Sequence, residues 1–110
     1  MKTLTVRRLK VAYRPEAIAD LADIYRFVAE RSQSRNVALA FVQRIRARCR
    51  KIGDAPNGGQ SRNDLSQGLR TVPFERSAVI AYLVESDRVR ITNVFYGGRD
   101  YEAVYRDGGE

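Results

Sequence analysis

The sequence has 110 residues, a formal net charge of +7, one cysteine and no histidine. This length supports one hydrophobic core, so we expect a single domain over residues 1–110. Apolar residues make up 44% of the chain, which excludes a mainly disordered protein. The lack of histidine and the single cysteine exclude a His/Cys zinc site, a histidine-based triad and an intrachain disulfide. We therefore expect neither a metal ion nor a cofactor.

The sequence also lacks membrane and export signals. No stretch approaches the roughly 18 apolar residues that span a bilayer. The N-terminal segment MKTLTVRRLK is basic but lacks the apolar core of a secretory signal. We expect a cytoplasmic protein with no membrane contact.

The positive charge is concentrated in two blocks. Residues 1–14 carry five basic residues and residues 35–52 carry six, and neither block contains an acidic residue. Such a field attracts an anionic partner, either nucleic acid or an acidic protein segment. The alternative interpretation is a solvated basic surface without a partner.

Along the chain, residues Leu9–Tyr13 alternate in a way that predicts a first strand. A helix is predicted to begin at Pro15, because proline at the first helical position has a suitable φ and Glu16 suits the positive end of the helix dipole. Its apolar face is expected to consist of Ile18, Leu21, Ala22, Tyr25, Val28 and Ala29. Ile24 and Phe27 widen this apolar surface, so the helix is expected to touch both the sheet and the neighbouring helix.

A second helix is predicted over about Arg35–Ile52, after the hydroxyl caps that Ser32-Gln33-Ser34 offers. The short connection predicts an antiparallel helical hairpin. Since no histidine is present to activate Cys49, we interpret it as a buried thiol and not a nucleophile. The buried arc of this helix is expected to hold Ala38, Phe41, Val42, Ile45, Cys49 and Ile52.

The segment Gly53–Gln67 lacks periodicity, and its Gly, Asn and Pro content predicts irregular structure through most of it. A connection this long is often functional, and a plain linker is the equally weighted alternative.

Three antiparallel strands joined by two tight turns are predicted at Leu69–Phe74, Ala78–Val84 and Val89–Tyr96. Pro73 places the first at or near a sheet edge. The second is apolar throughout, which predicts a central strand buried on both faces. The third is expected to alternate, with Val89, Ile91, Asn93 and Phe95 on one face and Arg90, Thr92, Val94 and Tyr96 on the other. The predicted class is α+β, with an N-terminal strand and a helical hairpin packed on a mainly antiparallel sheet.

A set of arginines and tyrosines is expected near the end of this sheet. Such side chains suit binding a phosphate backbone or stabilising charge on it, with a tyrosine hydroxyl available as a proton relay. The set consists of Arg70, Tyr96, Arg99, Tyr101 and Tyr105.

The order of these elements resembles the RelE/ParE superfamily of toxins from type II toxin–antitoxin systems. Four strings carry the resemblance: Arg14-Pro15-Glu16-Ala17, Gly68–Pro73, Val79–Tyr82 and Val94–Asp100. Together they extend the resemblance from about Lys10 to Tyr105, and the pieces look most like the ParE branch.

The ParE resemblance implies a plasmid-stabilisation toxin that binds DNA gyrase and is neutralised by a small acidic antitoxin with a DNA-binding N-terminus. It implies a binding protein and not an enzyme. The residues expected to contact target or antitoxin are Arg70, Tyr96, Arg99, Asp100 and Tyr101.

The alternative is a ribosome-dependent messenger-RNA endoribonuclease of the RelE type. Its basic positions are matched here by Arg70 and Arg99 and its tail tyrosine by Tyr105, whereas two further basic positions fall on Val72 and Val79. Because that chemistry relies on several cations around the attacked phosphate, the two valines favour the binding interpretation. Arg70, Arg99 and Tyr105 remain the only catalytic candidates. For Arg99 and Asp100, a structural pairing at the sheet exit is the alternative.

Overall fold

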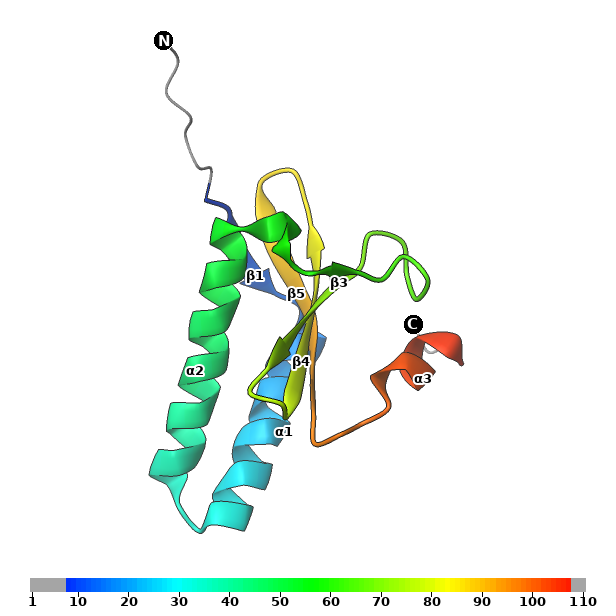
Figure 1. Ribbon diagram of the computed structural model, residues 1–110. Coiled ribbons are helices and arrows are strands. Elements are labelled where there is room, and N and C mark those ends of the chain that lie inside the picture. Colours follow the sequence, from blue (N-terminus) through cyan, green and yellow to red (C-terminus); the bar gives the residue numbers. More distant parts are fainter. Residues whose placement is uncertain (1–7, 108–110) are drawn as a thin grey trace.

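The computed structural model describes residues 8–107, and Figure 1 shows a helical hairpin beside a sheet, with a short third helix near the C-terminus. The elements in chain order are β1 (Lys10–Tyr13), α1 (Pro15–Ser32), α2 (Arg35–Asp54), the 3₁₀ turn η1 (Pro56–Gly58), β2 (Gln60–Ser61), β3 (Arg70–Phe74), β4 (Ala78–Val84), β5 (Arg88–Tyr96) and α3 (Tyr101–Arg106).

The sheet has the strand order β1-β5-β4-β3-β2. β1 pairs in parallel with β5, and all the other pairs are antiparallel. The predicted α+β class and the central position of β4 are confirmed. On the side of β3 away from β4, the sheet contains only the two-residue strand β2, which pairs with Arg70 and Thr71. Pro73 therefore lies near the edge, as predicted.

The two long helices begin where the sequence predicts. Pro15 opens α1, and the Ser34 hydroxyl caps α2 by accepting a hydrogen bond of 3.1 Å from the Val37 amide. Cys49 is fully buried in the predicted arc of α2, and burial raises the pKa of its thiol. α2 ends at Asp54, two residues beyond the predicted end. Gly53 packs so closely against Leu9 and Val11 that a Cβ would have no room, and its carbonyl accepts a hydrogen bond of 2.9 Å from the Leu9 amide.

The buried face of α1 differs from the prediction. Ala17, Leu21 and Ile24 are buried and Val28 packs beside them, while Ile18 is 56% exposed. The stripe follows the helical spacing from the small residue Ala17, which allows α1 to approach the sheet closely. The predicted face is correct for Leu21, Val28 and the added Ile24, but it omits Ala17 and includes Ile18, and Phe27 is 43% exposed.

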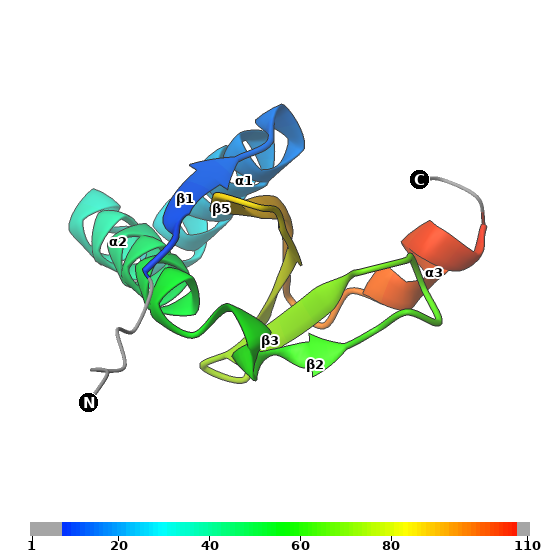
Figure 2. The ribbon, with the colours of Figure 1, turned by 90° about the horizontal axis from the view of Figure 1, so that it is seen from above.

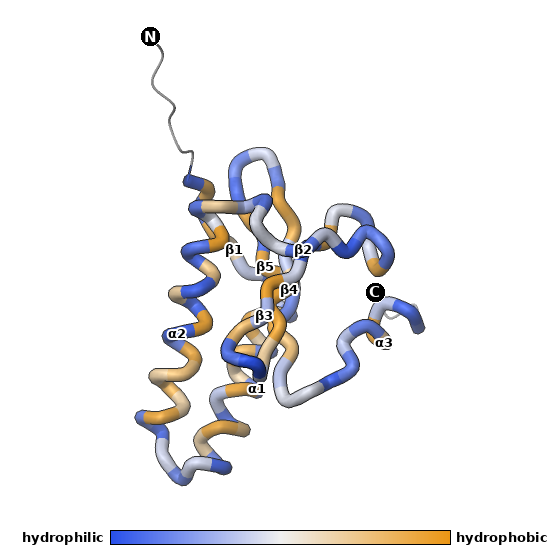
Figure 3. Tube along the Cα trace, in the orientation of Figure 1, coloured by the Kyte–Doolittle hydropathy of each residue, from blue (hydrophilic) through white to orange (hydrophobic). Residues whose placement is uncertain are grey.

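The main core fills the layer between the helical hairpin and the sheet. Ile45 of α2, Ile80 and Tyr82 of β4 and Ile91 of β5 are each fully buried in it. Figure 3 shows hydrophobic residues concentrated in β4 and on the helices, whereas the segment before β3 is mainly hydrophilic. Figure 2 shows that α3 lies on the opposite side of the sheet from α1 and α2.

The strict alternation predicted for β5 is wrong, because the strand contains a β-bulge. Ala81 of β4 pairs with Asn93 and Tyr82 pairs with Ile91, so Thr92 has no partner residue. Its hydroxyl instead donates to the Ala81 carbonyl at 3.2 Å. After the bulge, side chains at odd and even positions of β5 lie on the opposite faces from those that regular alternation predicts. Val94 follows Ile91 into the main core, and Phe95 lies on the other side.

The segment Gly53–Gln67 contains more regular structure than predicted, namely the end of α2, η1 and β2. It is fastened to the sheet by Tyr82, whose hydroxyl donates to the Pro56 carbonyl at 2.8 Å and accepts from the Gly59 amide at 3.0 Å. These bonds satisfy a buried hydroxyl and hold η1 against the end of β4.

Among the residues that the structure describes, no helix has the length and apolar character needed to cross a membrane.

We predict that Ile80→Ala lowers the free energy of unfolding by about 2–5 kcal/mol, because it opens a cavity in the main core. Urea denaturation monitored by circular dichroism measures this. The control is Val84→Ala on the same strand, where the side chain is 38% exposed and the expected loss is only about 0.5 kcal/mol. Equal losses in the two variants would contradict the central position of β4.

Candidate binding surface on the second face of the sheet

The second face of the sheet is the face turned away from α1 and α2. Its centre is Phe95, which is buried together with Leu69 and Ala81. The bulge at Thr92 decides this position, since without the extra residue Phe95 would lie on the side of the helices. A second apolar cluster therefore forms outside the main core.

α3 covers this cluster with two tyrosines. The Tyr101 ring stacks on Phe95 with centroids 5.2 Å apart, and the Tyr105 ring meets Phe95 edge-on at 6.3 Å. The helix has only six residues, so it is too short to be stable alone. Its position depends on these contacts and on the polar network beside them.

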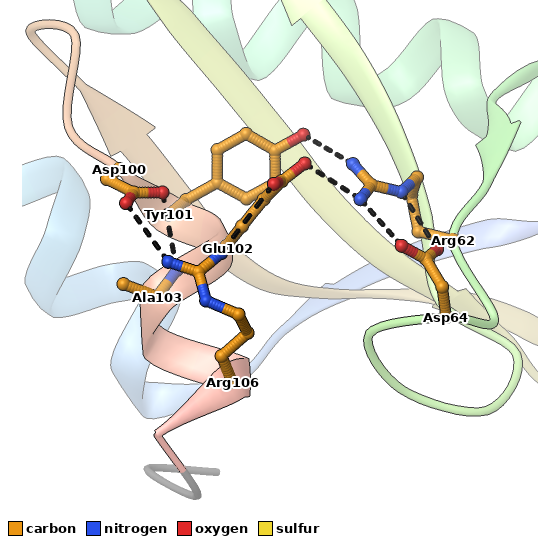
Figure 4. A network of polar contacts seen from close by, with 7 residues as sticks. All are labelled: Arg62, Asp64, Asp100, Tyr101, Glu102, Ala103 and Arg106. Atoms are coloured by element: carbon orange, nitrogen blue, oxygen red, sulfur yellow. Dashed lines mark hydrogen bonds and ion pairs between the residues drawn. The ribbon is translucent and has the colours of Figure 1, made fainter.

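Arg62 ties α3 to the segment before β3 (Figure 4). Its guanidinium binds both oxygens of Asp64 at 2.8 and 3.0 Å and one oxygen of Glu102 at 2.8 Å. It also donates to the Tyr101 hydroxyl at 3.0 Å. The Arg62 side chain is only 13% exposed, which separates this cluster from the solvated ion pairs of the surface.

The N-terminus of α3 is fixed by Asp100. Its carboxylate accepts from the Ala103 amide at 3.4 Å and pairs with Arg106 at 3.3 Å, as drawn in Figure 4. Asp100 therefore has a structural role, although its partner is Arg106 and not Arg99. Arg99 instead lies over the Phe95 ring, with its guanidinium carbon 5.4 Å from the centroid.

Two hollows flank α3 on the second face. The larger one, of about 460 Å³, has a mixed lining. Leu65, Leu83 and Val104 are among its apolar side chains, and Arg14 and Glu16 are its charged ones. A smaller one of about 150 Å³ lies between Val79 and the Tyr101 side of α3. Both hollows offer apolar positions, and the lining of the smaller one includes Arg99 and no acidic residue.

The structure brings together some of the predicted site residues and separates others. Arg99, Tyr101 and Tyr105 gather around Phe95. Tyr96 lies on the helix side of the sheet, against Phe27 and Phe41 at centroid distances of 5.5 Å.

Arg70 is also remote from the second face. It lies opposite Tyr82 in the register, and its guanidinium donates to the carbonyls of Asn57 at 3.2 Å and Gly59 at 2.7 Å. Arg70 thus holds the segment around η1 in place. Val72, two residues on, is buried in the main core.

Tyr105 is poorly suited to proton transfer at neutral pH. Burial raises the pKa of its hydroxyl, and contact with Thr92 opposes this only in part. Within residues 8–107, no three His, Cys, Asp or Glu side chains gather in an arrangement that would hold a metal ion. The cluster around Phe95 is thus apolar and aromatic, with the Arg99 guanidinium over its ring.

Sequence reasoning missed Arg62 and Phe95 as members of this surface. Arg62 lies in an aperiodic segment, and only the acidic Asp64 beside it hinted at a local pair. Regular alternation places Phe95 on the same face as Val89 and Ile91, because the sequence carries no signal for the unpaired Thr92.

Comparison with known protein families supports the resemblance seen in the sequence. The family described as "ParE toxin of type II toxin-antitoxin system, parDE" matches residues 11–101. The chain belongs to this family. The match spans β1 to the first residue of α3, so most of α3 lies beyond the part of the chain that the family match covers.

Among solved structures, the ParE-family fold is found again in "Chromosomal ParDE TA system from P. aeruginosa". That chain is 23% identical, with a TM-score of 0.71 over 83% of this chain and 98% of the other. No curated protein matches the sequence. The predicted ParE-like assignment and the type II toxin–antitoxin context are thus confirmed.

We predict that Arg62→Gln loosens α3 in this ParE-family chain, because the variant loses the charged bonds to Asp64 and Glu102. The measurement is limited trypsin digestion, in which cleavage after Arg99 and Arg106 is expected to accelerate. Arg88→Gln serves as control, since Arg88 pairs only with its neighbour Asp87 at the surface. The same cleavage rates in both variants would show that Arg62 does not hold α3.

Proposed function

We propose that this chain is a toxin that acts by binding DNA gyrase and is neutralised by a cognate antitoxin. The proposal refines the ParE family membership, and one observation carries it. The three candidate catalytic side chains do not lie together. Arg70 donates hydrogen bonds to the segment around η1 on the helix side, whereas Arg99 and Tyr105 lie around Phe95 on the second face.

This separation argues against the ribonuclease alternative. Cleavage of an RNA strand requires cations placed together around one phosphate and a group that moves a proton. Arg70 already donates to two backbone carbonyls, and Val72 is buried where a further cation would be needed. The raised pKa of Tyr105 keeps its hydroxyl protonated at neutral pH, so little phenolate is present to act as a general base.

For target or antitoxin contact, we propose Arg99 and Tyr101 on the second face. Arg99 is exposed and Tyr101 is partly exposed beside it. The remaining candidates are proposed to have structural roles. Arg70 holds the segment around η1, Tyr96 packs against the helices, and Asp100 fixes the start of α3.

We propose that the antitoxin docks on the second face. Its apolar side chains would enter the hollows beside α3, and its acidic residues would lie near Arg14 and Arg99. Addition of an antitoxin strand along β3 is disfavoured, since Pro73 lacks an amide hydrogen on that edge.

To test the target, we expect the purified chain to inhibit supercoiling by gyrase and to leave messenger RNA intact in a translating extract. Gyrase activity is followed by gel electrophoresis of plasmid topoisomers, and the message by primer extension. Codon-dependent cuts that disappear in Arg99→Gln or Tyr105→Phe would overturn the proposal in favour of the ribonuclease.

To test the antitoxin surface, we expect Leu83→Asp to weaken binding of the cognate antitoxin, once identified from a small acidic reading frame beside this gene, by more than about tenfold, because it places a charge in the larger hollow. Isothermal titration calorimetry measures the affinity. Val84→Asp is the matched control. Val84 follows Leu83 in β4, so its side chain lies on the opposite face of the sheet, and it is exposed. If only Val84→Asp lost affinity, the antitoxin would bind on the helix side of the sheet, and the proposed surface would be wrong.

A further inference from the structure

The C-terminal half of α2 carries arginines at every second position, followed by Lys51. They are Arg44, Arg46, Arg48 and Arg50. Because an α-helix turns about 100° per residue, arginines two positions apart project to opposite flanks. Arg44, Arg48 and Lys51 form one row and Arg46 and Arg50 form the other, with about 6 Å of axial rise between residues four positions apart.

Contacts in the fold confirm the two rows. On one flank, Arg44 pairs with Glu75 in the turn between β3 and β4 at 2.9 Å. On the other flank, the Arg46 guanidinium lies 4.9 Å from the centre of the Tyr13 ring in β1. The rows therefore border opposite sides of the exposed surface of α2.

The charge of these rows is largely unneutralised. Within residues 8–107, Arg44 is the only member that forms an ion pair, and Arg46, Arg48, Arg50 and Lys51 have no acidic partner. In Figure 3, hydrophilic positions recur through this half of α2. Four free cations on one and a half turns produce a strong local positive field.

The surface between the rows has no apolar anchor for a protein partner. Its residues are Ala40, Gln43, Ala47 and, at the end of the helix, Asp54, which pairs with Arg8. The exposed large apolar residues of α2, Val37 and Leu39, lie in the first turns of the helix. Protein interfaces depend on a few buried apolar or aromatic anchors. Phosphates, in contrast, are bound by charge alone.

We propose that α2 binds duplex DNA by inserting this half of the helix into the major groove, with one row of cations on the phosphates of each strand. A helix with its side chains is about 10–12 Å wide, and the groove of B-form DNA is about 12 Å wide. Duplex RNA is excluded by geometry, since its major groove is too narrow and deep. The inference goes beyond the proposed function, because contact with DNA does not require that gyrase is the target.

The experiment is fluorescence anisotropy of the full chain with a short labelled DNA duplex, without gyrase, over a series of salt concentrations. Four phosphate contacts predict that log K falls with log salt with a slope of about −3.6. The variant Arg48→Gln/Arg50→Gln removes one cation from each row. We expect its slope to be smaller by about 1.8 and its affinity to be about 60-fold lower at about 0.1 M salt.

The matched control is Arg26→Gln/Arg31→Gln, which removes the same charge from exposed positions of α1 and is expected to leave the slope nearly unchanged. Thermal unfolding verifies that both variants are folded. The proposal is overturned if the control weakens binding equally, if duplex RNA of the same sequence binds as tightly, or if the α2 variant loses affinity for the antitoxin but not for DNA. Because gyrase is absent, none of these outcomes bears on its inhibition.

Discussion

The β-bulge at Thr92 determines which side chains of β5 lie on each face of the sheet. One residue without a partner, held by a hydrogen bond to the Ala81 carbonyl, reverses the alternation in the second half of β5. Val94 then completes the core beneath the helices, and Phe95 is delivered to the second face. A β5 strand with unbroken alternation would bury Phe95 under α1 and leave α3 without a surface to pack on.

Because of this reversal, the two faces of the sheet have different roles. The helix side supplies stability through a continuous apolar core, and there Arg70 and Tyr82 secure the segment around η1. The second face has too little apolar surface for a second core, but enough to hold α3 when Arg62 adds its charged bonds. Such a lightly held helix beside apolar hollows is the feature on which the partner contact proposed above for this ParE-family chain depends.

The sequence predicts the fold well wherever a local signal is strong. Pro15 marks the start of α1, Pro73 places β3 near the edge, and the apolar run Ala78–Val84 identifies the central strand. The bulge escapes prediction because both faces of β5 carry apolar residues, so a shift by one position leaves the pattern equally plausible. Arg62 escapes it because its partners depend on how an aperiodic segment meets the C-terminal helix, which is a tertiary contact without a periodic signal.

The most direct test of this account is a nuclear Overhauser experiment on the free protein in solution, observing the ring protons of Phe95. The account predicts cross-peaks to the rings of Tyr101 and Tyr105, which lie 5.2 and 6.3 Å away between centroids, and none to Leu21 or Ile24 of α1. Cross-peaks from Phe95 to those α1 side chains would mean that β5 has no bulge at Thr92 and that the second face is not built as described.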